Sequence, residues 1–425
     1  MTRQPAIAIL CEERFHEVGG EIYGSNAFGR SYWQRYGDVF GNLVVIARVE
    51  TRDRVAQAAE PLAGAVLDLR PLPSFRGPAR LLPKLPGVLG ALRRTTRGVD
   101  GFIVRWPGTL TLLALPYLLA SGKPIAVEVV GDSRAVFRSG VGGLASAVLA
   151  RLAAAAGKHL FAAASAVTYV TERHLQAHYP APPGAIEAAF SDVVLADGDL
   201  AARPRPAADF ESEPARLLFA GTMEQGYKGI NVLLDAAARL DADGADFELR
   251  IAGAGRLEAA VRARIAALAL ERRVAMLGRI SRPALRAEMD RCHLFLVPSL
   301  TEGLPRTIVE AMARAAPVLA SDVGGIPELL PPHCLVPPGD AAALAAAIAD
   351  RLARPAALAA MSNANLAGAA RFTEAATAPA RRSFYLAFRA LAEAEAAQGG
   401  GGAGRNPKKS RLAGGEAAEV QGGAP

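Results

Sequence analysis

Two glutamates with a short, fixed separation are the side chains in this sequence best placed to do chemistry. Glu302 and Glu310 have seven residues between them in the stretch PSLTEGLPRTIVEAMA, residues 298–313. The apolar run HLFLVPS, which ends inside this stretch, predicts a buried strand. Pro305 is a favourable first residue of a helix, because its missing N–H is not needed there. We therefore expect Glu302 in the loop after the strand and Glu310 on the helix.

The start of this predicted helix suits a ligand with both phosphate and hydroxyl groups. The free N–H groups of Gly303 and Leu304 lie at the positive end of the helix dipole, where they can face anions or hydroxyls. Because helical side chains tilt toward the N terminus of the helix, the Glu310 carboxylate can accept two hydroxyls of a ribose, and Glu302 would meet a sugar. A sugar nucleotide offers all of these groups. On the two glutamates alone, the alternative of two solvated surface charges stays open.

Short apolar runs alternate with longer helical segments in both halves of the chain. This alternation is typical of a parallel sheet covered by helices. The runs are AIAIL, NLVVIARV, GFIVRW, PIAVEVV and AVTYV in the first half, and ARLLFAG, FELRIAG, RVAMLG, HLFLVPS and APVLAS in the second. The sequence therefore predicts two Rossmann-like, doubly wound α/β domains, in which ligands bind outside the carboxyl ends of the strands. Two such domains facing each other make a cleft.

A stretch rich in Pro, Ala and Asp at 196–214 interrupts this alternation and is typical of a linker. We therefore expect an N-terminal domain over 1–198 and a C-terminal domain over 199–375. The alanine-rich sequence that follows favours helix, with a last helix at 376–396. Residues 397–425 have the Gly-rich composition of a disordered tail.

Composition excludes several classes of protein. The 48 Lys and Arg exceed the 41 Asp and Glu by seven, which suits an anionic ligand or surface, but the basic residues lack the interleaved aromatic side chains typical of nucleic-acid binding. Three cysteines without CxxC spacing argue against a disulfide framework and a zinc site. The N-terminal stretch does not resemble a secretory signal, and the longest apolar runs are shorter than the roughly 20 residues of a membrane-spanning helix. A cytoplasmic location is expected.

Three longer stretches carry a resemblance to a known family. FAGTMEQGYKGINVLLDAAARL, IAGAG and VAMLGRISRPALRAEMDRCHLFLVPSLTEGLPRTIVEAMARAAPVLASDVGGIPELL together resemble the family 4 retaining glycosyltransferases of the GT-B fold. The glutamate pair, the YKG segment and DVGGIPEL come in the family's order and spacing over 216–330. The resemblance implies that the C-terminal domain holds a nucleoside diphosphate sugar, that the N-terminal domain holds the acceptor, and that a C-terminal helix returns to the N-terminal domain.

The resemblance also assigns individual residues. Lys228 matches the lysine whose charge neutralises the departing diphosphate, although a surface lysine is the alternative. Gly278 and Arg279 match the turn that cradles the base, with Arg279 able to stack on it. Gly19 and Gly20, in HEVGGEIYGSN, resemble the glycine-rich first loop whose backbone reaches into the cleft, and an ordinary turn is the alternative.

Two departures from the family pattern affect the expected site. The family usually has an arginine after the first strand of the donor domain, where this chain has Gly-Thr-Met at 221–223, so Thr222 takes that place and one diphosphate cation is missing. Gly131 stands where family members commonly have a histidine near the sugar. Asp132 follows it and is a candidate to orient the acceptor hydroxyl or take its proton, although Asp after Gly is also ordinary turn chemistry. Arg105, in VRWPG, is a candidate acceptor contact.

By the same resemblance, transfer would retain the configuration of the sugar through an oxocarbenium-like state, with the departing diphosphate helping to deprotonate the acceptor. We expect no cofactor and no metal, and a UDP- or GDP-sugar as donor. Two alternatives stay open. One is a non-catalytic subunit that binds a nucleotide sugar, which Thr222 and Gly131 favour. The other is a nucleotide-sugar 2-epimerase, for which no clustered set of His and carboxylate residues is evident.

A basic stretch at 74–98 suggests a surface for the acceptor. It interleaves Leu and Phe with six cations and no acid: Arg76, Arg80, Lys84, Arg93, Arg94 and Arg97. A basic amphipathic segment can rest on anionic lipid headgroups, which would place the protein at the inner face of the cell membrane beside a lipid-linked acceptor. A solvated helix face that packs its leucines on the core is the alternative.

Overall fold

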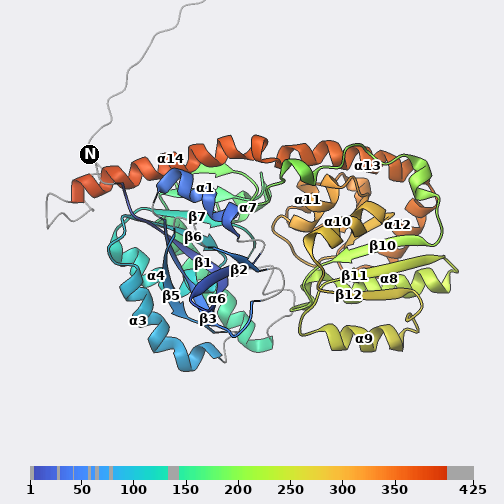
Figure 1. Cartoon of the computed structure of the whole chain (residues 1–425), viewed down its shortest axis with the longest axis horizontal. Coiled ribbons are helices and arrows are strands. Elements are labelled where there is room, and N and C mark those ends of the chain that lie inside the picture. Colours follow the sequence, from blue (N-terminus) through green and yellow to red (C-terminus); the bar gives the residue numbers. More distant parts are fainter. Residues whose placement is uncertain are drawn as a thin grey trace, which may run out of the picture.

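Two parallel sheets, each covered by helices, lie beside one another in a computed structural model of the chain (Figure 1). The structure describes residues 4–25, 29–41, 43–55, 59–62, 67–75, 80–132 and 143–399. Each of the ten apolar runs named above forms a strand. The predicted fold class of two Rossmann-like domains is therefore confirmed.

The first sheet has seven parallel strands, in the order β5-β3-β1-β6-β7-β8-β9. Their bounds are β1 Ile7–Val18, β3 Leu43–Thr51, β5 Leu67–Pro73, β6 Gly101–Trp106, β7 Ile125–Val129, β8 Ala166–Tyr169 and β9 Ile186–Ala189. The strand order reverses direction at β1, which pairs with both β3 and β6. Helices α3 (Leu85–Thr95), α4 (Thr109–Ser121) and α6 (Gly143–Ala162) contribute to one apolar core, whereas α1 (Arg30–Phe40) contributes to another.

The second sheet has six parallel strands in the order β12-β11-β10-β13-β14-β15. The strands are β10 Ala215–Ala220, β11 Phe247–Ala252, β12 Val274–Gly278, β13 Leu294–Val297, β14 Val318–Ser321 and β15 Leu335–Val336. The helices are α8 Ile230–Ala242, α9 Glu258–Ala267, α10 Arg282–Arg291, α11 Arg306–Ala313, α12 Ala341–Leu352 and α13 Pro355–Ala369. This order reverses between β10 and β13, which makes the carboxyl ends of those two strands the expected place for a ligand.

Two segments cross between the domains, and they pair with each other. Leu195, which follows the last strand of the first sheet, forms a parallel bridge with Thr373. Helix α14 (Glu374–Gly399) then runs along the first domain (Figure 1). Its Phe384, Tyr385 and Phe388 are buried in the same core as α1 and the first sheet. The expected return of the last helix to the N-terminal domain is confirmed.

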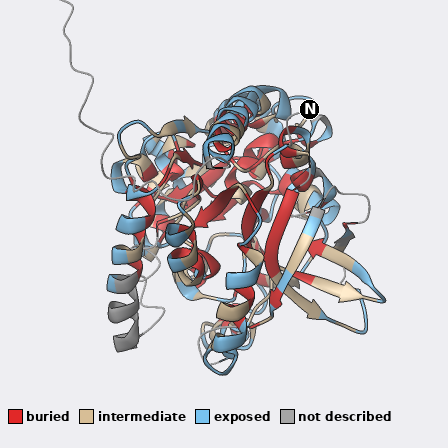
Figure 2. Ribbon diagram, turned by 90° about the vertical axis from the view of Figure 1, so that its left-hand side faces the viewer, coloured by how far each residue is buried: buried red, intermediate tan, exposed pale blue. Residues whose placement is uncertain are grey.

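Burial differs between the strands of the sheets and the helices that cover them. Buried residues concentrate on the central strands, and exposed ones on the outer faces of the helices (Figure 2). All six residues of β6 are buried, because a parallel strand covered by helices on both faces has no solvent side.

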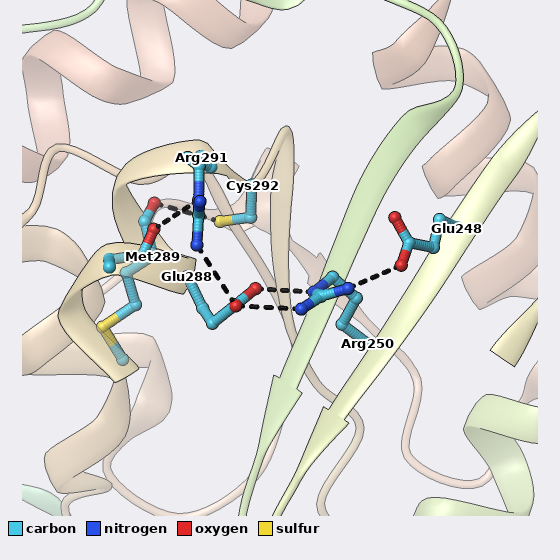
Figure 3. Close-up of polar contacts among 7 residues, drawn as sticks. Glu248, Arg250, Glu288, Met289, Arg291 and Cys292 are labelled. Carbon is cyan, nitrogen blue, oxygen red and sulfur yellow. Dashed lines mark hydrogen bonds and ion pairs between the residues drawn. The ribbon is translucent and has the colours of Figure 1, made fainter. Parts of the chain in front are cut away.

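One ion-pair cluster ties a helix of the second domain to its sheet. Arg250 of β11 donates to both oxygens of Glu288 on α10, at 2.6 and 3.0 Å, and to Glu248 at 2.6 Å (Figure 3). The hydrogen bonds from Arg250 hold the pKa of the Glu288 carboxyl below its usual range. This cluster lies on β11 and α10 and holds none of the predicted site residues.

Candidate active site

Lys228 and Glu302 form an ion pair where the order of the second sheet reverses. Lys228 ends a short 3₁₀ turn, Gly226–Lys228, after β10, and Glu302 lies in the loop after β13. The Lys228 Nζ is 2.7 Å from Glu302 Oε1, and the Ser299 hydroxyl donates to the same oxygen at 2.7 Å. The side chains are 19% and 8% exposed. A cation and a carboxylate are thus fixed together at the carboxyl ends of two adjacent parallel strands.

A close backbone approach brings these two residues together. Gly229 adopts a left-handed conformation with φ of 71°, and a Cβ there would collide with the carbonyl oxygen of Pro298. The Leu300 N–H donates to the Tyr227 carbonyl at 2.7 Å. Only glycine fits at position 229, because both the φ angle and the space exclude a side chain.

The loop that carries Glu302 also meets the first domain. A Cβ at Gly303 would collide with the carbonyl oxygen of Val130, at the end of β7. The N–H of Gly325, in the segment after β14, donates to the Gly303 carbonyl at 2.8 Å. Leu304 is buried beside it. We name residues 301–304 the donor loop, after the sugar nucleotide that the sequence predicts there; it lies between the two sheets and contacts both domains.

Glu310 lies on α11, as predicted, and is half-buried. Its carboxylate is 3.9 Å from the guanidinium of Arg282, the first residue of α10. Gly278 ends β12 with φ of 65°, and its carbonyl accepts the Gly253 N–H at 2.8 Å. Arg279 is exposed. The predicted base-binding turn therefore lies two strands away from Lys228 in the sheet.

The place of the missing arginine is occupied by an exposed hydroxyl. Thr222 is exposed, and its Oγ1 accepts the Glu224 N–H at 3.3 Å. Arg256, from the loop after β11, donates to the Glu224 carbonyl at 2.5 Å. A second cation therefore lies beside the segment that leads to Lys228. Sequence reasoning missed Arg256, although its place directly after IAGAG at the end of a strand was a usable signal.

Asp132 and Arg105 are both buried in the first domain and bonded within it. Asp132 is 9% exposed and accepts the Tyr179 hydroxyl at 2.6 Å. Arg105 is also 9% exposed; it donates to Glu128 at 3.2 Å and to Asp192 at 2.9 Å. The guanidinium of Arg105 thus already has two carboxylate partners, and its role as an acceptor contact stays a prediction.

His174 is a titratable group near Asp132 that sequence reasoning missed. It begins α7 (His174–His178), and its ring lies 4.8 Å from that of His178. Partial burial lowers the pKa of His174, the neighbouring His178 lowers it further, and the carboxylates of Asp132 and Glu328 act in the opposite direction. The imidazole therefore favours its neutral form.

Gly19 and Gly20 form the turn of a β-hairpin rather than an open loop. Strand β1 continues to Val18, and β2 (Glu21–Ser25) returns antiparallel to it, with Val18 opposite Glu21. The two glycines have φ of 60° and 85°, and no atom lies within 4 Å of a Cβ built on either. The turn favours glycine at both positions, because both residues have positive φ.

The basic stretch is helical in its second half. On α3 the side chains of Val88, Ala91 and Leu92 are buried, whereas Arg93 and Arg94 are exposed. Arg80 and Arg97 are also exposed, Lys84 donates to the Ser74 carbonyl, and Arg76 lies outside the described residues. Among the described helices, none is long and apolar enough to span a bilayer.

Known proteins are similar to this chain in sequence and in fold. The family model described as glycosyl transferases group 1 matches residues 214–354. CapJ of Staphylococcus aureus is 28% identical over 75% of this chain and 79% of its own length. The amylovoran biosynthesis glycosyltransferase AmsK of Erwinia amylovora is 38% identical, over 32% of this chain and 35% of AmsK.

Two solved structures share the fold at low sequence identity. Sucrose-phosphate synthase from Thermosynechococcus elongatus matches with a TM-score of 0.68 and 20% identity, covering 91% of this chain and all of that one. HepE of Anabaena, solved with UDP-glucose, matches with a TM-score of 0.58 and 16% identity over 93% of this chain and 100% of its own. Together with the two-sheet architecture, these matches show that the chain has the GT-B fold and that residues 214–354 are similar to the glycosyl transferases of group 1.

Proposed function

We propose that the protein transfers a sugar from a nucleoside diphosphate sugar to a saccharide or lipid-linked acceptor in the synthesis of a polysaccharide or glycoconjugate, with retention of configuration. The ion pair between Lys228 and Glu302, 2.7 Å apart at the carboxyl ends of β10 and β13, is the observation that carries this proposal. It puts a cation for the diphosphate and a carboxylate for sugar hydroxyls side by side. AmsK, which is named an amylovoran biosynthesis glycosyltransferase, is a relative that supports a biosynthetic role.

The expected chemistry is electrostatic. As the bond between the anomeric carbon and the diphosphate breaks, negative charge grows on the leaving oxygen. Lys228 and the N–H groups at the start of α11 stabilise that charge. The acceptor oxygen bonds to the anomeric carbon on the face that the diphosphate leaves, and its proton passes to the departing phosphate. Glu302 holds the sugar in register, and Glu310 holds the ribose.

The donor is a UDP- or GDP-sugar, and transfer proceeds without a metal ion. HepE, which shares the fold, was solved with UDP-glucose, and this makes UDP the first base to test. Gly278 and Arg279 would receive the base. Gly303, Leu304 and Thr222 would face the diphosphate through backbone or hydroxyl groups.

The acceptor side is proposed to be the first domain, where Asp132, Arg105 and the hairpin at Gly19 and Gly20 lie. Asp132 is proposed to orient the acceptor hydroxyl. The exposed arginines of α3 would bring the enzyme to an anionic membrane surface, where a lipid-linked acceptor would be found.

A thermal-shift panel of UDP, GDP, ADP and their common sugars, in the presence of EDTA, is the first test. A ligand that binds only the folded state raises the melting temperature of the protein. One nucleoside diphosphate should therefore stabilise the protein and so identify the base of the donor. Transfer from the matching sugar nucleotide, followed by NMR of the new anomeric proton, would test retention. Stabilisation by a sugar nucleotide without transfer would favour the non-catalytic subunit, and 2-epimerised donor would favour the epimerase alternative. No stabilisation by any nucleotide would count against the proposed function.

A further inference from the structure

A single carboxylate of the second domain accepts three backbone N–H groups of the first. Glu328 ends a 3₁₀ segment, Ile326–Glu328, shortly after β14. Its Oε2 accepts the Glu172 N–H at 2.5 Å, and its Oε1 accepts those of Arg173 and His174 at 3.1 and 2.7 Å. These donors follow β8 and are more than 150 residues away in sequence, between 154 and 156 positions from Glu328.

Glu328 acts as the cap of α7 from the opposite domain. The first N–H groups of a helix have no partner within the helix and are usually satisfied by a side chain just before it or by water. The N-cap residue of α7, Arg173, makes no such side-chain bond. A carboxylate that accepts several backbone N–H groups forms charge-assisted hydrogen bonds, which are shorter and stronger than neutral ones. Thr171 of the first domain accepts the Leu175 N–H at 3.0 Å, and the three N–H groups before it depend on Glu328 of the opposite domain.

Arg371 reinforces this contact from the segment that crosses back to the first domain. Its Nη2 donates to the Glu328 carbonyl at 2.5 Å, and its Nη1 lies 3.6 Å from the Glu172 carboxylate. Three parts of the chain thus meet around Glu328: the end of β14, the start of α7, and the crossing segment before α14.

The same segment braces the donor loop. Gly325, three residues before Glu328, donates its N–H to the Gly303 carbonyl at 2.8 Å. A Cβ at Gly325 would lie 2.6 Å from that carbonyl oxygen and 2.7 Å from the Thr171 methyl of the first domain. Residues 324–328 are therefore held between the donor loop and the strand end of β8, so a shift of Glu328 moves the donor loop relative to the first domain.

The interface around Glu328 is not filled by packed apolar side chains. A cavity of about 130 Å³ lies beside it, lined in part by Leu304, Phe190, Leu329 and Phe372. This cavity is partly open to solvent and is also lined by Glu172 and Arg371, so apolar packing does not close this side of the interface. Polar contacts between loops thus hold this side of the interface, and such contacts can open without exposing a continuous core.

We propose that Glu328 is a positioning residue for sugar transfer: by capping α7 from the opposite domain, it sets the distance between the donor loop and the acceptor-binding first domain. This inference rests on the proposed function. It predicts a loss in the transfer step rather than in donor binding, because Glu328 touches neither Lys228 nor Glu302 but fixes where the first domain meets them.

The test compares Glu328→Ala and Glu328→Gln with Glu271→Ala, an exposed carboxylate of the same domain with no such cross-domain role. Glutamine keeps an acceptor oxygen but presents an amide NH₂ to one of the three N–H groups, so its effect should be intermediate. Each variant is measured for UDP affinity by calorimetry, for kcat with saturating donor, and for the distance between spin labels on Arg94→Cys of α3 and Arg262→Cys of α9, both exposed sites.

For Glu328→Ala we expect unchanged UDP affinity, a fall in kcat of at least about tenfold, and a broader distribution of inter-label distances, since misplacement of reacting groups by an ångström can cost about 100-fold. Equal losses of UDP affinity and kcat, or an unchanged distance distribution, would overturn the inference. Failure of the wild type to bind any nucleotide would instead count against the proposed function, and the distance measurement would still test the role of Glu328.

Discussion

The Lys228 ammonium lies 2.7 Å from Glu302 Oε1, and this pair joins the segment after β10 to the loop after β13. Both side chains are largely buried, so each would be costly to leave without a partner. The Ser299 hydroxyl gives Glu302 a second bond and fixes its orientation. The pair is therefore already positioned before a donor arrives, which limits the reorganisation that binding requires.

Replacing Lys228 with alanine should weaken UDP binding by about 10- to 100-fold, because a hydrogen bond to a charged group contributes about 1.5–3 kcal/mol. Calorimetric titration with UDP measures this, with Lys158→Ala, an exposed lysine of α6, as the control. An unchanged affinity in Lys228→Ala would remove this lysine from the donor site.

Glu302→Gln should reduce turnover far more than nucleotide affinity. The glutamine amide has nearly the same shape as the carboxylate, but only its one oxygen can accept a hydrogen bond from a sugar hydroxyl. A misplaced sugar costs about 100-fold in rate. The measurement compares the change in kcat between the wild type and Glu302→Gln with the change in the dissociation constant of UDP. Parallel losses in both quantities would contradict the assignment of Glu302 to the sugar.

A methyl group at position 303 should impair transfer by pushing the two domains apart. In Gly303→Ala the new Cβ would collide with the carbonyl oxygen of Val130, which is backbone and cannot rotate away. We expect a reduced kcat with donor affinity less affected. Gly198→Ala is the matched control, because no atom lies within 4 Å of a Cβ there. Equal activities of the two variants would show that the contact between Gly303 and Val130 is not needed for transfer.

Changing Arg93, Arg94 and Arg97 to glutamine should reduce binding to vesicles that contain phosphatidylglycerol. Each cation near an anionic surface contributes about 1 kcal/mol, so the loss should be on the order of 100-fold and should shrink in high salt. Sedimentation with anionic and with phosphatidylcholine vesicles measures it. A variant with three other exposed arginines replaced, Arg203, Arg272 and Arg382, is the control. Unaltered sedimentation of the α3 variant would favour a solvated helix face.

Because of the buried His293, the folded protein should be less stable in mild acid than at neutral pH. Its Nδ1 accepts the Arg216 N–H at 3.0 Å, so the ring must be neutral, and burial together with Arg205 and Arg216 lowers its pKa. The unfolded chain then binds the proton more readily than the folded one. The contribution of neutral His293 to the stability of the folded protein is fully present above the ordinary histidine pKa of about 6.5, and it is lost as the pH falls below that value.

Denaturant midpoints at pH 7, 6 and 5 would measure this dependence. In His293→Asn the Oδ1 can accept the same N–H without titrating, so the midpoint should change less with pH than in the wild type. His333→Asn, at an exposed histidine, serves as the control. The same pH slope in the wild type and in His293→Asn would assign the acid sensitivity to other groups.

Much of the fold was predictable because parallel strands covered on both faces are continuous apolar runs, such as AIAIL in β1 and HLFLVPS around β13. Lys228 and Glu302 each follow one of these apolar runs, but only the structure shows that their strands, β10 and β13, are neighbours. A turn at Gly19 and Gly20 was only the alternative interpretation, because β1 continues beyond its apolar run. Two extended segments separated by Gly-Gly were nevertheless a hairpin signal.

Contacts between the domains were beyond prediction from the sequence. The hydrogen bonds that the N–H groups of residues 172–174 donate to Glu328 depend on the relative orientation of two sheets, which no local pattern encodes. Within the first domain, the Tyr179 hydroxyl after α7 donates to Asp132 after β7, 47 positions away, and nothing in the residue types marks that pair in advance.

The return of α14 to the first domain has a consequence for synthesis on the ribosome. The apolar core that contains Ile7 and Ile9 also contains Phe384, Tyr385 and Phe388 of α14. That core is therefore incomplete until almost all of the described chain has been synthesised. Domains generally fold in the order in which they are made. Here all strands of the second domain are synthesised before α14. The N-terminal domain is therefore translated first, but its core is completed last.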